Sequence, residues 1–139
     1  MSFITSADLE NALYPHIIDE IKESNTAAEP AALSAAEQTV ESYLAQRYDT
    51  ETIFSQTGNN RNAMIVEICL TIAVWNFIKL CNAETLYDIW RDRYEDAIRF
   101  LEKTASGEIA PKLPPLRDEQ GNTVNKIQIT SNPKFRHSW

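Results

Sequence analysis

The stretch from Ala63 to Cys81 constrains the fold most, because it is apolar on almost every side. Its polar members are Glu67, Thr71, Asn76 and Lys79. A helix that is apolar all round lies either in a protein core or in a membrane, and this stretch is close to the length of about 20 residues that a membrane span needs. Charged side chains are costly in lipid. The sequence therefore predicts a soluble core helix over this range.

Shorter or more polar elements precede the core helix. Apolar residues recur every three or four positions from Ala31 to Tyr48, which predicts an amphipathic helix with Pro30 as its first residue. The polar segment from Asp49 to Asn60 is predicted to be a loop. Two short helices, Ser6 to Tyr14 and Pro15 to about Glu23, are expected near the N-terminus.

A long amphipathic helix is predicted after the core helix, from Glu84 to Ser106. Its charged face places Glu95 and Arg99 at the spacing of an ion pair. Gly107 is expected to end the helix in a left-handed conformation. Aromatic residues of the two longest helices fit their apolar stripes and are predicted to pack in the core: Trp75, Phe77, Trp90, Tyr94 and Phe100.

The composition changes after residue 110. Residues 1–110 carry 8 basic and 18 acidic side chains, whereas residues 111–139 carry 5 basic and 2 acidic ones. Pro111, Pro114 and Pro115 predict an extended linker, and alternation from Val124 to Thr130 is typical of a half-buried strand. We therefore predict an all-α body of about four helices at residues 1–110 and an extended or β-like C-terminal arm at residues 111–139.

Charge and residue types argue against several classes of function. A net charge of −7 disfavours general nucleic-acid binding, which depends on clustered Lys and Arg. The histidines His16 and His137 have no partners at catalytic or metal-ligand spacing, and three glycines in total leave no phosphate-binding loop. Cys69 and Cys81 lie about 18 Å apart along one predicted helix, too far for a disulfide.

Two pairs of carboxylates share a helix face and are candidates for a metal site: Glu37 with Glu41, and Asp88 with Asp92. No histidine accompanies either pair, and such spacing is common on solvated helix surfaces. We therefore predict no enzyme activity, no cofactor and no metal site.

The C-terminal segment has the basic and aromatic residues of a binding anchor. We predict that it contacts a neighbouring subunit or another protein through Lys134, Phe135, Arg136, His137 and Trp139.

Two motifs resemble the head–tail connector proteins of Mu-like phages and prophages. One runs from Glu41 to Tyr48, and the other runs from Asp92 to Leu101 and on to Gly107-Glu108-Ile109. The start from Thr5 to Leu9 and the order of helices agree with this resemblance. Family members often have a Pro-Pro pair before the third long helix, where this chain has Asn59-Asn60-Arg61-Asn62.

The resemblance implies a structural role as a subunit of an oligomeric ring between the phage head and tail. Its expected partners are further copies of the chain, the portal and tail-completion proteins, with DNA only as passing cargo and no membrane. The expected location is the head–tail junction of the virion, after assembly in the host bacterial cytoplasm. Two alternatives remain open: a bacterial protein-binding adaptor that forms no ring, and a metal-dependent helical hydrolase.

Overall fold

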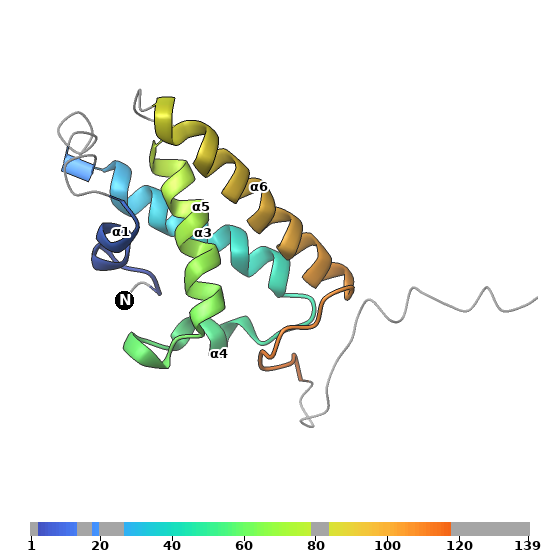
Figure 1. The fold of residues 1–139 in the computed structure, drawn as a ribbon. Helices are drawn as coiled ribbons and strands as arrows, with labels where there is room; N and C mark the ends of the chain where they lie inside the picture. The colour runs from blue at the N-terminus through green and yellow to red at the C-terminus, as the bar shows by residue number, and fades with distance from the viewer. Residues whose placement is uncertain (1–2, 14–17, 20–26, 79–83, 118–139) are drawn as a thin grey trace, which may run out of the picture.

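A computed structural model of the chain describes residues 3–13, 18–19, 27–78 and 84–117 (Figure 1). Within these residues lie five α-helices and one short 3-10 turn: α1 (Ser6–Ala12), α3 (Ala28–Leu44), α4 (Thr50–Ser55), η1 (Gly58–Asn60), α5 (Ala63–Ile78) and α6 (Glu84–Ser106). No strand occurs among them, and an isolated antiparallel bridge pairs Tyr48 with Pro115. The predicted all-α body is confirmed for the described part of the chain. The predicted strand of the arm lies outside it.

Helix α5 is the centre of the body, as its apolar sequence predicts. It contacts α1, α3 and α6 (Figure 1). Half of its 16 residues are buried: Ile65, Ile68, Cys69, Ile72, Ala73, Val74, Phe77 and Ile78. Its one described charge, Glu67, is exposed. Among the described helices none is long and apolar enough to cross a membrane.

Helix α3 makes the most extensive contact with α5. Ala36 on α3 and Ala73 on α5 are both fully buried and belong to the larger core cluster. The helix begins at Ala28, two residues before the predicted start, so Pro30 is its third residue and not its first. Proline is tolerated in a first turn, where backbone N–H groups have no helical partner. Burial of Ala28 and Glu29 explains the earlier start.

The segment predicted as a loop from Asp49 to Asn60 contains helix α4, so that prediction was wrong for Thr50–Ser55. Asp49 caps the helix by accepting the backbone N–H of Thr52 at 3.2 Å and its hydroxyl at 2.7 Å. These hydrogen bonds lower the pKa of Asp49. So short a helix is marginal alone, and burial of Ile53 supplies the tertiary support.

Helix α6 begins and ends at the predicted residues. Gly107 closes it with a φ of +88°. The N–H of Gly107 bonds the carbonyl of Thr104 at 3.2 Å, and the N–H of Glu108 bonds that of Lys103 at 2.9 Å. This pair of bonds is a Schellman motif, in which glycine is favoured because a side chain is strained at positive φ.

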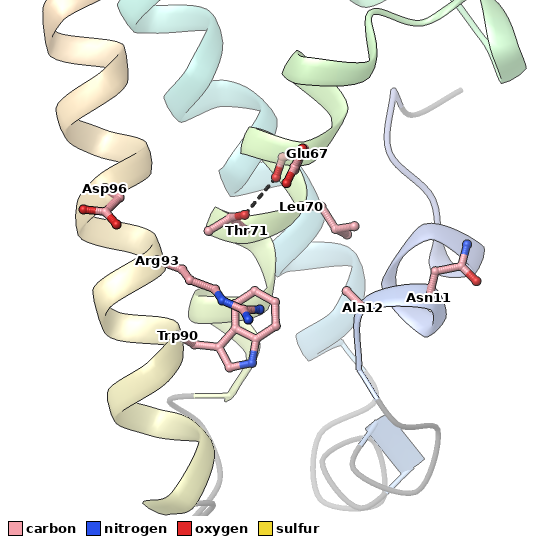
Figure 2. A pocket seen from close by; sticks show the side chains of 8 residues that line it. All are labelled: Asn11, Ala12, Glu67, Leu70, Thr71, Trp90, Arg93 and Asp96. Carbon is pink, nitrogen blue, oxygen red and sulfur yellow. Dashed lines mark hydrogen bonds between the residues drawn. The ribbon is translucent and has the colours of Figure 1, made fainter.

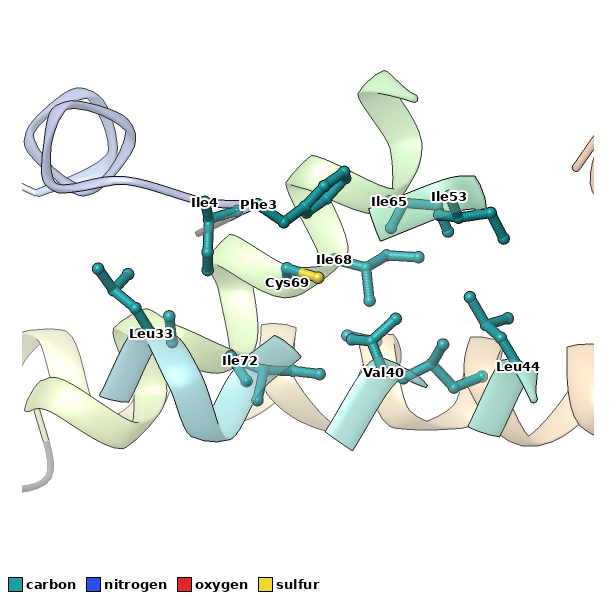
Figure 3. Packing of buried hydrophobic residues seen from close by; sticks show 14 of the residues in the cluster. Phe3, Ile4, Leu33, Val40, Leu44, Ile53, Ile65, Ile68, Cys69 and Ile72 are labelled. Atoms are coloured by element: carbon teal, nitrogen blue, oxygen red, sulfur yellow. The ribbon is translucent and has the colours of Figure 1, made fainter. Parts of the chain in front are cut away.

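The larger core cluster joins the N-terminal segment, helices α3, α4, α5 and α6, and Leu113. Figure 3 labels its residues from the N-terminal segment, α3, α4 and α5. The N-terminal Phe3 and Ile4 cover residues of α3, α4 and α5, and the Phe3 ring meets Phe54 edge to face at 4.8 Å. A second cluster lies towards the other end of α5 and includes Leu9, Phe77 and Trp90. Burial raises the pKa of the Cys69 thiol, which lies in the larger cluster. Its predicted helix neighbour Cys81 lies outside the described residues.

Candidate subunit interface

The two motifs that carry the phage resemblance meet at one end of the body. Arg47, at the end of the first motif, donates from Nε to the carbonyl of Ala105 at 3.2 Å and from its guanidinium to that of Ser106 at 3.4 Å. These carbonyls end α6 and lack helical partners, and a cation is favourable there. Arg47 therefore joins the end of α3 to the end of α6.

The first residues of the predicted arm pack on this same end. The N–H of Leu116 donates to the carbonyl of Arg47 at 3.0 Å, and the N–H of Asp49 donates to that of Pro114 at 2.9 Å. Leu113 is buried in the larger core cluster. Residues 111–117, predicted to be an extended linker, bend at Lys112, where the N–H of Leu113 donates to the carbonyl of Pro111 at 3.0 Å, and they are fixed to the helical body.

The predicted contact residues of the arm lie beyond this fixed segment. The structure does not describe Lys134, Phe135, Arg136, His137 and Trp139, so their role stays a prediction. The described part of the arm ends at Arg117, directly after Leu116, whose N–H donates to the carbonyl of Arg47.

An open groove of about 670 Å³ lies between α1, α5 and α6 (Figure 2). Its volume is within the range of protein ligand sites. Polar and apolar side chains from the three helices line it: Asn11, Ala12, Glu67, Leu70, Thr71, Trp90, Arg93 and Asp96. The groove lies on the opposite side of α6 from Glu95 and Glu102 by helical position.

The charges around the groove differ in how they are paired. The Arg93 guanidinium stacks 4.7 Å from the centre of the Trp90 ring, a cation–π contact. Asp96 accepts from Arg99 at 2.7 Å. Glu67 has no ion-pair partner among the described residues, and its neighbour Thr71 bonds only its backbone carbonyl, at 2.9 Å.

The charged face of α6 is exposed as predicted, but one predicted pair is not formed. Arg99 pairs with Asp96 at i,i+3 and not with Glu95 at i,i+4. Residues three and four apart are both neighbours on a helix surface, so the two carboxylates compete for one guanidinium. Asp88 and Asp92 both lie within 4 Å of Arg91.

The other acidic pair also has local partners. Glu37 is half-buried and accepts the backbone N–H of Ile4 at 3.0 Å, which holds the N-terminal segment on α3. Glu37 is therefore more than part of a solvated acidic face, the role that the sequence indicated. No group of three metal-binding side chains occurs among the described residues.

Arg61 is a structural residue that the sequence did not reveal. It bonds both carboxylate oxygens of Asp8, at 2.7 and 3.2 Å, the carbonyl of Phe3 at 2.8 Å and the carbonyl of Gly58 at 2.8 Å. Its bonds lower the pKa of Asp8 against the opposing effect of burial. Asp8 also completes a capping box with Thr5 at the start of α1.

The sequence shows each residue of the Asp8–Arg61 contact but not that the two residues meet. Asp8 in a first turn and Arg61 in a polar loop are each visible, but they lie 53 residues apart. At the position where the resemblance implies a Pro-Pro pair, this chain therefore has an arginine that fixes the N-terminal helix.

Comparison with known proteins places this arrangement in a family. The sequence profile described as Bacteriophage Mu, Gp36 matches residues 3–128, which is most of the chain. No curated protein and no solved structure matches significantly. The match includes the groove, both motifs that meet at Arg47 and the first part of the arm. The chain belongs to the Bacteriophage Mu Gp36 family.

Proposed function

We propose that this chain is a non-catalytic subunit of a phage head–tail connector, and that several copies form a ring between the portal and the tail. Membership of a Mu phage family carries the proposal. The helical body supports it, because a rigid body with a fixed arm root suits repeated contacts between identical copies. Contacts of this head-to-tail kind close into a ring when the rotation between copies allows it.

The outer face of α6 supports a second part of the proposal, that DNA passes through the ring as cargo. Its exposed acidic residues are Asp88, Asp92, Glu95 and Glu102. A lumen lined by carboxylates repels DNA phosphates and does not hold them. We propose that this face lines the lumen, with the portal and tail-completion proteins at the two ends of the ring.

The first experiment counts this chain in assembled particles. Phage-like particles are purified from the source strain after induction, and quantitative mass spectrometry compares the copies of this chain with those of the portal protein. We expect each particle to contain several copies of this chain, as many as one ring requires. Complete particles that lack this chain would rule out the connector role.

The lumen is tested separately in those particles. Glu95→Lys is expected to slow DNA ejection, because a cation at this face attracts phosphate, whereas Glu95→Gln should have a smaller effect. Equal ejection rates for both variants and the wild type would show that α6 does not face the DNA.

A further inference from the structure

The groove between α1, α5 and α6 has an acidic side chain available for a partner. Glu67 is exposed and has no ion-pair partner within the described residues, although it lines a cavity that also contains Arg93 and Asp96. Arg93 is already stacked on Trp90, and Asp96 is paired with Arg99. A basic residue that enters the groove would therefore find one unpaired carboxylate at Glu67.

An exposed apolar side chain lies outside the groove lining but on the same face of α6. Ile89 is 50% exposed. It lies seven residues, almost two turns, before Asp96 and so on nearly the same helix face. Leu70 and Ala12 add apolar surface within the groove itself. The site thus presents apolar contacts beside one free negative charge, which fits a segment that interleaves aromatic and basic residues.

The C-terminal arm contains such a segment and is long enough to reach another copy. Residues 134–139 read Lys-Phe-Arg-His-Ser-Trp. From Arg117, where the fixed root ends, Lys134 is 17 residues away, which spans at most about 60 Å when extended. Helix α6, with 23 residues, is only about 35 Å long. The arm can therefore pass beyond its own body.

We propose that the groove between α1, α5 and α6 receives residues 134–139 from the arm of a neighbouring copy. Lys134 or Arg136 pairs with Glu67, and Phe135 or Trp139 packs against Leu70 and Ile89. This inference rests on the proposed ring, because it names the surface through which adjacent copies are joined. Each copy then contributes two surfaces to the ring. Its groove receives the arm of one neighbour, and its own arm, which is fixed beside Arg47, reaches the groove of the other neighbour.

Charge reversal tests the pairing in the full chain. Glu67→Lys is expected to weaken self-association at least tenfold in sedimentation, and adding Lys134→Glu with Arg136→Glu should restore most of it. The matched control is Glu41→Lys, which makes the same charge change at an exposed site on α3, outside both the groove and the proposed lumen face. Circular dichroism confirms that each variant is folded. Equal weakening by Glu67→Lys and Glu41→Lys, or no rescue, would overturn the pairing.

Crosslinking between isotope-labelled copies tests the position of the arm. Phe135 is replaced by p-benzoylphenylalanine, light and heavy chains are mixed before assembly, and crosslinked peptides are identified by mass spectrometry. Crosslinks from the arm of one isotope to α1, α5 or α6 groove peptides of the other are expected. Crosslinks confined to one isotope, or directed to another surface, would overturn the inference.

Sedimentation of the same samples separates this inference from the proposed function. If rings form but their arms crosslink to another surface, the connector role stands and the groove is not the binding site of the arm. If the arms crosslink to the groove but the complexes contain only two copies, the groove contact stands and the ring does not. Single chains without intermolecular crosslinks would overturn both.

Discussion

Helices α5 and α6 lie side by side and use their residues in opposite ways. In α5 the apolar residues surround the helix and pack against α1, α3 and α6. In α6 the buried positions form one stripe that includes Trp90, Ala97 and Leu101, and the opposite face is charged and exposed. Helix α5 supplies core contacts, whereas α6 also exposes a charged face that other molecules can contact.

The difference shows how the same residue type acquires different roles. Ile72 on α5 is 1% exposed and Ile89 on α6 is 50% exposed. Removing the first leaves a cavity in a close-packed core, whereas removing the second uncovers nothing. Stability therefore depends on α5, and we expect association to depend on the surface to which α6 contributes.

The sharpest test of this comparison makes the same substitution in both helices. Ile72→Ala is expected to lower the free energy of unfolding by about 2–5 kcal/mol, because burial is lost and a cavity remains. Ile89→Ala is expected to change it by less than about 0.5 kcal/mol. Urea unfolding followed by circular dichroism measures both. Similar losses from the two variants would show that α6 is not a one-sided helix.

A smaller loss is expected where α6 ends. Gly107→Ala forces a side chain into a left-handed conformation, at about 1–2 kcal/mol, and its Cβ would lie 2.5 Å from the Arg47 guanidinium. Displacing Arg47 removes its bonds to Ala105 and Ser106 as well. Gly58→Ala is the matched control, because Gly58 has a φ of +58° but nothing within 4 Å of the added Cβ.

The two glycine variants should therefore differ in thermal stability. Both share the cost of positive φ, so the difference between their melting temperatures reports the contact with Arg47. If Gly58→Ala destabilises the protein as much as Gly107→Ala, the Arg47 contact contributes nothing measurable.

The contact of Asp8 with Arg61 should make stability depend on acid pH. Its hydrogen bonds hold the pKa of Asp8 below the ordinary value of 3.8. The resulting stabilisation is fully present above the ordinary pKa and is lost as the pH falls through the lowered, folded-state value. Asp8→Asn, which carries no charge, is expected to cost about 1.5 kcal/mol at pH 7 and to flatten this part of the profile.

Melting temperatures of the wild type and of Asp8→Asn between pH 6 and pH 2 measure the effect. The gap between them should narrow as the pH falls below about 4. Asp19→Asn is a suitable control, since Asp19 is an exposed carboxylate. A gap that stays constant over this range would mean that Asp8 does not titrate with folding.

Patterns within short stretches of sequence correctly predicted helices α5 and α6. The uninterrupted apolar run specified α5, and the stripe with a following glycine specified α6 and its end at Gly107. Helix α4 was missed because its six residues become stable only when Ile53 enters a core made from distant segments. The start of α3 was misplaced for the same reason, since burial of Ala28 depends on packing with the second core cluster.

The sequence predicted which residue types the candidate interface contains, but not where on the body they lie. The basic and aromatic residues of the arm are visible in the sequence, and so is the acidic body. No local signal brings Asn11, Glu67 and Trp90 to one groove, because they come from three helices whose packing is set by long-range contacts. Nor does a local signal show that Leu113 is part of the core, so truncations should begin after Arg117.

The smallest expected effect concerns the exposed ion pair on α6 and completes the contrast with α5. Arg99 and Asp96 lie 2.7 Å apart with side chains 60% and 74% exposed. Water screens such a pair, so Arg99→Gln should lower the free energy of unfolding by less than about 0.5 kcal/mol. Because Asp96 lines the groove, the same variant leaves a second unpaired carboxylate there. Self-association through a basic arm should then be unchanged or tighter, and a clear weakening in sedimentation would show that the groove receives a partner of different charge.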